Sequence, residues 1–187
     1  KLLGRTRDDA AGESFDKVGK MLGLPYPGGP AIEKLARNGN AKAHKFPRAY
    51  LEKGSLDFSF SGLKTSVRTF LQHREQKSSI TLTDEDVSAG FQEAVIDVLV
   101  DKLISACQQE GLTRIVVTGG VASNGALRVA VKQAAQDYGF DASFPDPIFC
   151  TDNAAMIACA GHHKFARDHS LTADLKALDA KANLALE

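Results

Sequence analysis

Two segments of the sequence place polar side chains where a predicted strand passes into a predicted helix. The first is VVTGGVASNG, in which Gly119 and Gly120 precede Ser123 and Asn124. Glycine lets the main chain come close to a ligand, and the free N–H groups of a helix N-terminus suit a phosphate or a carboxylate. The segment is neither a G-x-G-x-x-G fingerprint nor a P-loop. A tight strand-to-helix turn with Asn124 as its cap explains the local features equally well.

The second such segment is CTDNAAMIA, with Asp152 and Asn153 at the predicted helix start. In open α/β sheets, ligands bind at the edge where strands pass into helices. Asp152 can therefore bind a metal ion, a hydroxyl group or a water molecule there. A capping aspartate is the simpler interpretation when this segment is considered alone.

Acidic residues gather in a third segment, DDAAGESFDK, which is predicted to enter a helix. Glu13 and Asp16 are three residues apart and share a helix face, so they can bind a metal ion or sugar hydroxyls. A solvated acidic face balanced by Lys17 and Lys20 explains the same spacing. In a fourth segment, YPGGP, two glycines between prolines predict either a stiff loop with an exposed backbone or a plain turn between helices.

The segment DFSFSGLKT combines aromatic and basic residues. Phe58 and Phe60 alternate with serines, which predicts that the aromatic rings face the core. Lys64 and Arg68 are four residues apart on the following predicted helix, so they share a face, and we predict that this face points outward. Both belong to a basic segment, residues 41–77, which holds eight lysines and arginines against three acids.

Sequence patterns also predict the elements that position these segments. Helical spacing, capping residues and glycine stops predict helices, and short β-branched runs predict strands. The longest helix should begin with a capping box formed by Thr83 and Asp86. The predicted helices are residues 10–22, 31–39, 62–76, 84–110 and 125–138 and the segment after CTDN; the predicted strands are residues 115–118 and the segment FDASF. The order strand, helix, strand, helix predicts an α/β domain with a parallel sheet.

Composition excludes several classes of protein. The chain is 43% hydrophobic and 25% charged with zero formal net charge, so no global electrostatic argument favours nucleic-acid or membrane binding. Three widely spaced cysteines without a C-x-x-C pattern indicate free thiols in a reducing cytoplasm. No apolar run is long enough to span a membrane. Neither H-E-x-x-H nor G-x-S-x-G occurs, so a zinc protease of the usual helix type and a hydrolase elbow are unsupported.

In this order and spacing, DDAAGESFDK, YPGGP, DFSFSGLKT, GGVASN and CTDNAAMIA resemble the C-terminal half of the TsaD family, in its bacterial form. These are the tRNA N6-adenosine threonylcarbamoyltransferases, formerly named O-sialoglycoprotein endopeptidases or glycoproteases. The resemblance implies an α/β fold, namely the second lobe of an actin/Hsp70/sugar-kinase-like (ASKHA) fold with a helical insertion. Residues 1–30 and 86–170 would form the α/β core of that lobe, residues 31–85 a mostly helical insertion with a basic loop, and residues 171–187 a C-terminal tail.

The resemblance also implies roles for single residues. Asp16, Gly29 and Asn124 would contact the nucleotide-like substrate, threonylcarbamoyl-AMP. Asp16 would accept hydrogen bonds from ribose hydroxyls, Gly29 would present its backbone, and Asn124 would lie near the adenosine. Asp152 would be the third ligand of a divalent metal ion, iron or zinc, whose two histidine ligands are absent from this chain.

The implied reaction is transfer of a threonylcarbamoyl group from threonylcarbamoyl-AMP to N6 of adenosine 37, in tRNAs that read codons beginning with A. The implied partners are tRNA, whose phosphates Lys64 and Arg68 would contact, an inactive paralogue that forms a heterodimer, and a small P-loop ATPase. We expect a cytoplasmic protein without a membrane partner. We expect the chain alone to be inactive, and an open sheet edge would allow it to form a homodimer. The alternatives are a metalloendopeptidase, as in the older name, and a non-catalytic nucleotide-binding or dimerisation module.

Overall fold

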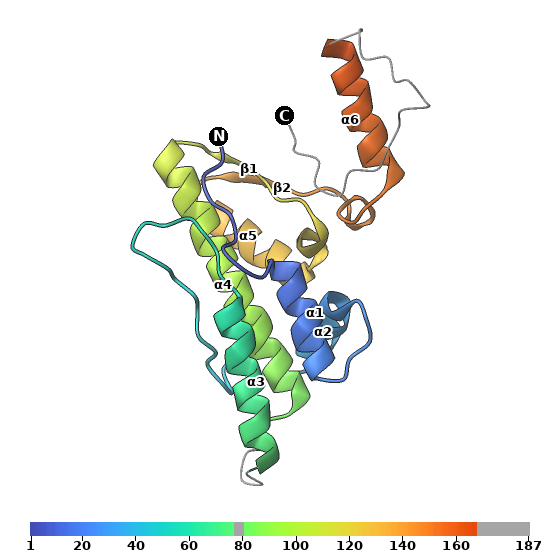
Figure 1. Cartoon of the computed structure of the whole chain (residues 1–187). Helices are drawn as coiled ribbons and strands as arrows, with labels where there is room; N and C mark the ends of the chain where they lie inside the picture. The colour runs from blue at the N-terminus through green and yellow to red at the C-terminus, as the bar shows by residue number, and fades with distance from the viewer. Residues whose placement is uncertain (77–80, 168–187) are drawn as a thin grey trace. The chain divides into compact units, whose positions relative to one another are not determined.

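A computed structural model describes residues 1–76 and 81–167 of the 187-residue chain. The chain divides into two compact units, Lys1–Thr151 and Asp152–Glu187. The first unit contains, in chain order, α1 (Ala11–Met21), α2 (Gly28–Ala36), α3 (Ser61–Gln76), α4 (Asp84–Glu110), β1 (Arg114–Val116), the 3-10 turn η1 (Gly120–Ser123), α5 (Gly125–Tyr138), β2 (Asp141–Ser143) and the 3-10 turn η2 (Pro147–Phe149) (Figure 1). Helix α6 (Ala154–Arg167) belongs to the second unit.

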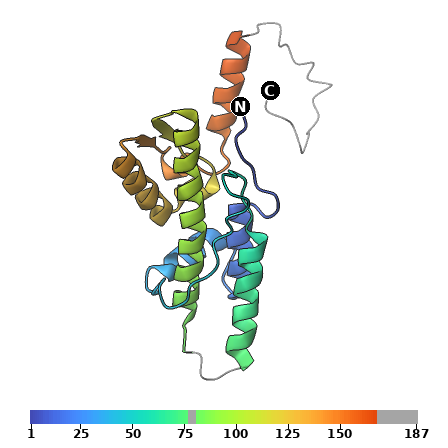
Figure 2. The same cartoon turned by 90° about the vertical axis from the view of Figure 1, so that its left-hand side faces the viewer.

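Helix α4 is the centre of the first unit. Its N-terminal half packs against α1, α2 and α3, and α3 runs alongside it in the opposite direction (Figure 2). In this core Phe15 of α1 meets Phe91 of α4 edge to face, with ring centroids 5.1 Å apart. The C-terminal half of α4 packs against β1 and α5 through smaller clusters that include Ile104, Ile115 and Val131. Burial of each such side chain contributes about 1.5–3 kcal/mol.

Local signals fix both ends of α4 and α5. The predicted capping box is confirmed, because Asp86 N–H donates to Thr83 Oγ1 and Thr83 N–H donates to Asp86 Oδ2, each at 3.2 Å. Helix α4 ends at Gly111 and α5 ends at Gly139, with φ of 65° and 69°. Glycine adopts this left-handed conformation at little cost. Both helices therefore have the predicted boundaries.

The strands β1 and β2 form a parallel pair in which Ile115 lies opposite Ala142. This confirms the mixed α/β class and the parallel arrangement, although β1 is shorter than the predicted strand at residues 115–118. Ile115 is buried against α4 and α5, whereas Val116 on the other face is 72% exposed. Among the described residues, no helix combines the length and apolar composition needed to cross a bilayer.

Helix α2 begins at Gly28, three residues before the predicted start, so the GGP of YPGGP forms the first turn of a helix and only Tyr26 and Pro27 precede it. The cause is tertiary contact. A Cβ on Gly28 would lie 2.7 Å from both Asp16 Cα and the Phe15 carbonyl oxygen, and a Cβ on Gly19 would lie 2.9 Å from Gly28 Cα. Glycines at these two positions let the backbones of α1 and α2 touch.

The predicted burial of the DFSFSGLKT aromatics is confirmed. Phe60 is buried and Phe58 is half-buried against the same core. The segment lies beside the N-terminal residues in a strand-like pairing, because Phe58 N–H donates to Arg5 O and Arg7 N–H donates to Phe58 O, each at 2.9 Å. This extended pairing explains why alternate side chains face the core.

The predicted insertion, residues 31–85, contains most of α2 and all of α3, and both helices share a core with α1 and α4. The division into an α/β core and a helical insertion stays a prediction. The predicted tail, residues 171–187, lies outside the described residues.

Candidate functional site

A cavity of about 370 Å³ opens in the first unit between α1, α2 and the turn before α5. Asp16 of α1, Gly29 of α2 and Asn124 of the turn all line it, so the structure brings the three predicted substrate-binding residues together. The other lining residues are Gly12, Phe15, Pro27, Pro30, Glu33, Gly120, Val121, Ser123 and Thr151. Apolar walls with a few convergent polar groups are typical of a small-molecule site.

One of the two carboxylate oxygens of Asp16 accepts a hydrogen bond within the fold. Its Oδ1 accepts a hydrogen bond from Gly28 N–H at 2.8 Å, which ties α1 to the first turn of α2. Within the described part of the chain its other oxygen, Oδ2, has no partner, so it can accept from a hydroxyl group of a ligand. Glu13 lies outside the cavity and pairs with Lys17 at 2.6 Å. The interpretation of Glu13 and Asp16 as a joint acidic site is therefore wrong, and Glu13 belongs to a charge-balanced surface.

Asn124 is both a helix cap and a wall of the cavity. Its Oδ1 accepts from Leu127 N–H at 2.9 Å, and its Nδ2 donates to Gln92 Oε1 at 2.8 Å. A side-chain amide has two N–H donors and two acceptor lone pairs. One N–H and one lone pair of Asn124 are therefore still available to a ligand. The capping interpretation is confirmed and does not compete with a binding role.

Glu33 is a cavity residue that the sequence reasoning missed. Its Oε1 accepts from Gly125 N–H at 3.1 Å and from Arg37 at 3.2 Å, and it joins α2 to the first turn of α5. Glu33 lies four residues after Gly29, so both share one face of α2. This four-residue spacing from Gly29 is the sequence signal by which Glu33 could have been found.

The charges around the cavity come from two carboxylates and two helix N-termini. Asp16 and Glu33 supply the carboxylates, Gly29 in the first turn of α2 lines the cavity, and both helices supply the positive potential of their N-termini. No lysine or arginine lines the cavity within residues 1–76 and 81–167. Such a site suits a ligand that offers hydroxyl donors to carboxylates and an acceptor group to N–H donors.

Asp152 begins the second unit and is exposed. The cap of α6 is the neighbouring Asn153, whose Oδ1 accepts from Met156 N–H at 3.0 Å, so the capping interpretation is wrong for Asp152. The described residues contain no cluster of three histidine, cysteine or acidic side chains that can hold a metal ion. One carboxylate is too few ligands for the three or more protein ligands that an iron or zinc site needs. The donors in the described residues therefore do not form a metal site by themselves.

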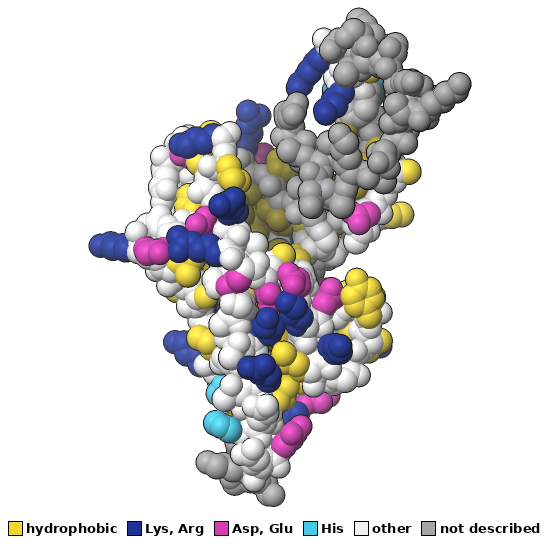
Figure 3. All heavy atoms as spheres, in the orientation of Figure 1, with side chains coloured by type: hydrophobic (Ala, Val, Ile, Leu, Met, Phe, Trp, Pro, Cys, Tyr) yellow, Lys and Arg dark blue, Asp and Glu magenta, His cyan; other side chains and the backbone are white. Residues whose placement is uncertain are grey.

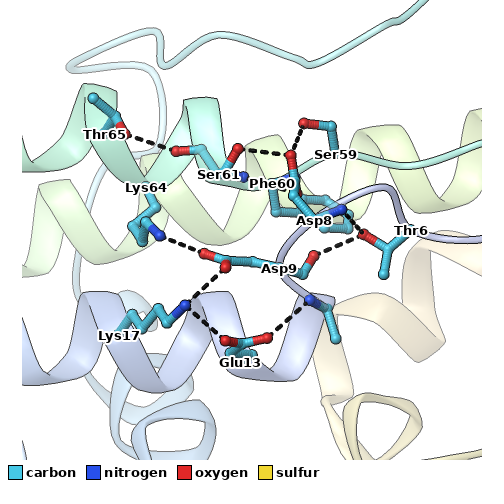
Figure 4. Close-up of polar contacts among 11 residues, drawn as sticks. Thr6, Asp8, Asp9, Glu13, Lys17, Ser59, Phe60, Ser61, Lys64 and Thr65 are labelled. Atoms are coloured by element: carbon cyan, nitrogen blue, oxygen red, sulfur yellow. Dashed lines mark hydrogen bonds and ion pairs between the residues drawn. The ribbon is translucent and has the colours of Figure 1, made fainter.

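A polar cluster joins the DDAAGESFDK and DFSFSGLKT segments (Figure 4). Asp8 lies at the start of α3, where its Oδ1 accepts from Phe60 N–H at 2.9 Å and Ser61 N–H at 3.2 Å. Its Oδ2 accepts from the hydroxyls of Ser59 at 2.5 Å and Ser61 at 2.6 Å. Partial burial raises the pKa of Asp8, but these four hydrogen bonds outweigh it and hold the pKa well below its usual range.

Asp9 lies between two lysines in the same cluster (Figure 4). Lys17 Nζ is 2.7 Å from its Oδ1, and Lys64 Nζ is 2.6 Å from its Oδ2. The Lys64 side chain is 23% exposed. Lys64 was predicted to point outward with Arg68, but its amine is paired inside the fold, because Asp9 is brought to it from 55 residues away.

The basic segment is partly neutralised by acids from elsewhere in the chain. Arg48 pairs with Glu93 and Asp97, and Arg74 pairs with Asp84. On the face drawn in Figure 3, basic and acidic side chains lie next to one another. Four exposed cations of this segment have no ion pair to another described residue: Lys42, Lys45, Lys53 and Arg68.

Comparison with known proteins gives the family. The family described as TsaD, tRNA N6-adenosine threonylcarbamoyltransferase, matches residues 1–159. The chain is 52% identical over 165 residues to a tRNA N6-adenosine threonylcarbamoyltransferase of Clostridioides difficile, and 53% identical over 169 residues to one of Desulfotalea psychrophila. These matches cover 88% and 89% of this chain but 48% and 49% of the relatives. The chain therefore spans about half the length of the curated relatives it matches.

A solved structure shares the fold. Full-length HypF, in a phosphate- and nucleotide-bound form, has a TM-score of 0.62 with 16% sequence identity, and the match covers 87% of this chain and 21% of HypF. A likeness at this identity concerns the fold alone. The family match rests on sequence over most of the chain. On that evidence the chain belongs to the TsaD family of tRNA N6-adenosine threonylcarbamoyltransferases.

Proposed function

We propose that this chain forms the second lobe, with its helical insertion, of an ASKHA-type threonylcarbamoyltransferase, and that its cavity binds the adenosine side of threonylcarbamoyl-AMP. One observation carries the proposal. Asp16 of α1 and Gly29 of α2, which follow each other along the chain, and the distant Asn124 before α5 line one cavity. The family membership and the span of about half of each relative agree with a chain that supplies one part of a larger site.

Each cavity residue has a role that its free groups support. The unpaired Oδ2 of Asp16 accepts from a ribose hydroxyl, and Gly29 offers its N–H at the start of α2. The remaining N–H and lone pair of Asn124 meet the adenosine. The positive end of α5 favours the phosphate of the AMP leaving group. In the reaction, N6 of the tRNA adenosine attacks the threonylcarbamoyl carbonyl, the bond between that carbon and the phosphate oxygen breaks, and AMP leaves together with one proton from N6.

Metal and partner roles complete the proposal. Asp152 would supply one ligand to a divalent iron or zinc ion, with the other ligands coming from outside this chain. Such an ion would polarise the carbonyl or hold the leaving phosphate. The partners would be tRNA, an inactive paralogue in a heterodimer and a small P-loop ATPase, all in the cytoplasm. The chain alone would be inactive in transfer, and a homodimer through its sheet edge stays a proposal.

Titration of AMP against the chain tests the cavity. We expect wild type to bind AMP, and Asp16→Ala and Asn124→Ala to lose affinity by about tenfold, because each removes a hydrogen-bonding group worth about 1–2 kcal/mol. Isothermal titration calorimetry measures the affinities. Glu13→Ala is the matched control, since it removes a carboxylate from the same helix outside the cavity. Equal AMP affinity in all four proteins, or no binding by wild type, would reject the proposed site.

Arg68 is the best candidate for tRNA contact on α3, because it is exposed and Lys64 is paired. In a full-length enzyme carrying this sequence, Arg68→Glu is expected to weaken tRNA binding severalfold and to reduce its salt dependence, because fewer counterions are released. Lys64→Glu should weaken tRNA binding mainly through loss of stability. Filter binding over a salt series measures both effects. Lys132→Glu, an exposed cation on α5, is the control, and an equal effect of this control would contradict a specific surface.

The alternative of a non-catalytic nucleotide-binding module uses the same cavity. It predicts AMP binding by this chain and no contribution to transfer when the other half of the enzyme is supplied. If transfer activity appears when the other half of the enzyme is added, the chain is part of the transferase. If AMP binds but no transfer activity appears, the chain is a non-catalytic nucleotide-binding module.

A further inference from the structure

Arg128 of α5 lies between two segments that border the cavity. Its Nε donates to the Ala122 carbonyl at 2.6 Å, and its Nη2 donates to the Pro145 carbonyl at 2.6 Å. Ala122 belongs to the turn η1, whose residues Gly120, Val121 and Ser123 line the cavity. Pro145 begins the segment 145–150, which leads into the lining residue Thr151. One guanidinium therefore holds both segments.

Two further contacts hold the Arg128 side chain in this position. Nη2 of Arg128 is 3.2 Å from Cys150 Sγ, and the guanidinium carbon lies 5.0 Å from the centre of the Phe144 ring. Cys150 is 5% exposed, and its thiol also points to the carbonyls of Pro145 and Asp146 at 3.8 and 3.7 Å. The guanidinium thus contacts both ends of the segment 145–150.

The segment itself has limited regular structure. It contains two prolines, which lack an N–H donor, and its regular structure is the single 3-10 turn η2. Ile148 and Phe149, in the middle of the segment, are 72% and 51% exposed, so the burial of apolar surface there is partial. A planar guanidinium can donate to two carbonyls at once in a fixed fork, which a lysine amine does not reproduce.

We propose that Arg128 is a positioning residue that fixes the segment 145–151 against the turn η1 and so sets the shape of the nucleotide cavity. Arg128 does not line the cavity itself. Its effect on a ligand passes through the neighbours of Ala122 on one side and through Thr151 on the other. This inference rests on the proposed nucleotide site for its functional consequence, whereas the fixing of the segment can be tested without any ligand.

The test compares thiol accessibility in variants of the 187-residue chain. In a Cys159→Ser background, Cys107 and Cys150 are the remaining thiols, and they are buried to a similar degree, at 7% and 5% exposed. Labelling by a small disulfide reagent follows the population of locally open states. Arg128→Gln is expected to speed labelling of Cys150 by about tenfold or more while Cys107 is unchanged, because charge-assisted hydrogen bonds to the segment are lost.

Binding of AMP gives the functional arm. Arg128→Gln is expected to lower AMP affinity by about fivefold or more, with Arg128→Lys between it and wild type, because lysine keeps the charge but not the fork. Lys132→Gln removes an exposed positive charge from the next turn of α5 and should change neither readout. If Arg128→Gln does not fold, Arg128→Lys provides the test. A higher ratio of Cys150 to Cys107 labelling in Arg128→Lys than in wild type is then the expected result.

Several outcomes overturn the inference. Equal acceleration of Cys107 and Cys150 would mean that Arg128 only supports the global fold. Unchanged Cys150 labelling would mean that it does not hold the segment. Faster Cys150 labelling with unchanged AMP affinity would mean that the segment does not shape the cavity. If wild type fails to bind AMP, the proposed nucleotide site is wrong, and so is the proposed effect of Arg128 on AMP binding. The ratio of Cys150 to Cys107 labelling would still decide whether Arg128 holds the segment.

Discussion

Replacing Gly28 by alanine is expected to destabilise the chain by about 3 kcal/mol and to abolish AMP binding. The new Cβ would lie 2.7 Å from both Asp16 Cα and the Phe15 carbonyl oxygen. Both are backbone atoms, which cannot move aside as a flexible side chain can. Overpacking a close contact costs about 1–3 kcal/mol, and separation of α1 from α2 also breaks the 2.8 Å hydrogen bond from Gly28 N–H to Asp16. Urea denaturation and calorimetric titration measure the two effects.

Gly29→Ala is the matched control, because it makes the same change one residue later. A Cβ on Gly29 would meet only Phe15 Cβ, at 4.0 Å, which is an ordinary contact. We expect the free energy of unfolding to stay the same or rise slightly, since alanine in a helix is favoured over glycine by up to about 1 kcal/mol. AMP affinity should still fall, because the methyl group enters the cavity wall. Equal stability of the two variants would show that the close approach of α1 and α2 is not required.

Features that depend on neighbours along the chain were predicted well from the sequence. Helices α4 and α5 begin and end where expected, because Thr83, Asn124, Gly111 and Gly139 act on backbone groups within one turn. The parallel pairing of the two strands followed from the order of the elements.

Features that depend on distant contacts were not predicted. The start of α2 lies against α1, where Gly19 leaves room for Gly28 and Asp16 accepts from Gly28 N–H, and no local pattern in YPGGP distinguishes a helix start from a turn. The four-residue spacing of Lys64 and Arg68 predicts a shared exposed face, but of these two cations only Lys64 pairs with Asp9.

The candidate site shows the same division. Asp16, Gly29 and Asn124 were each ambiguous when taken alone, and only the family resemblance linked them before the structure placed them around one cavity. Glu33 was missed because its role depends on the N–H of Gly125, which is 92 residues away.

Asp9→Ala is expected to lower the free energy of unfolding by about 2 kcal/mol. Removing the carboxylate takes the acid from between two lysine amines, so Lys64 loses its ion pair and Lys17 keeps its pair with Glu13. Breaking a buried ion pair from one side costs about 3–5 kcal/mol, and we reduce that figure because the lysine side chains are 39% and 23% exposed. In a Lys64→Met background the same substitution should cost less, because one of the two opposing charges is gone. Thermal and urea unfolding of the four proteins measure this coupling.

The pH dependence of the Asp9→Ala effect follows from the direction of the pKa shift. Hydrogen bonds from Lys17 and Lys64 hold the pKa of Asp9 below its ordinary value of 3.8, against a smaller opposing effect of burial. A carboxyl whose pKa is lowered on folding adds stability above its unfolded pKa and loses it as the pH falls through the folded pKa. The difference between wild type and Asp9→Ala should therefore be largest near neutral pH and shrink below 3.8. Glu13→Ala serves as the control, since Glu13 also contacts Lys17 but its side chain is 50% exposed. If Glu13→Ala destabilised the chain as much as Asp9→Ala, the link from α1 to α3 through Lys64 would add nothing, and Lys64 would again be a candidate for tRNA contact.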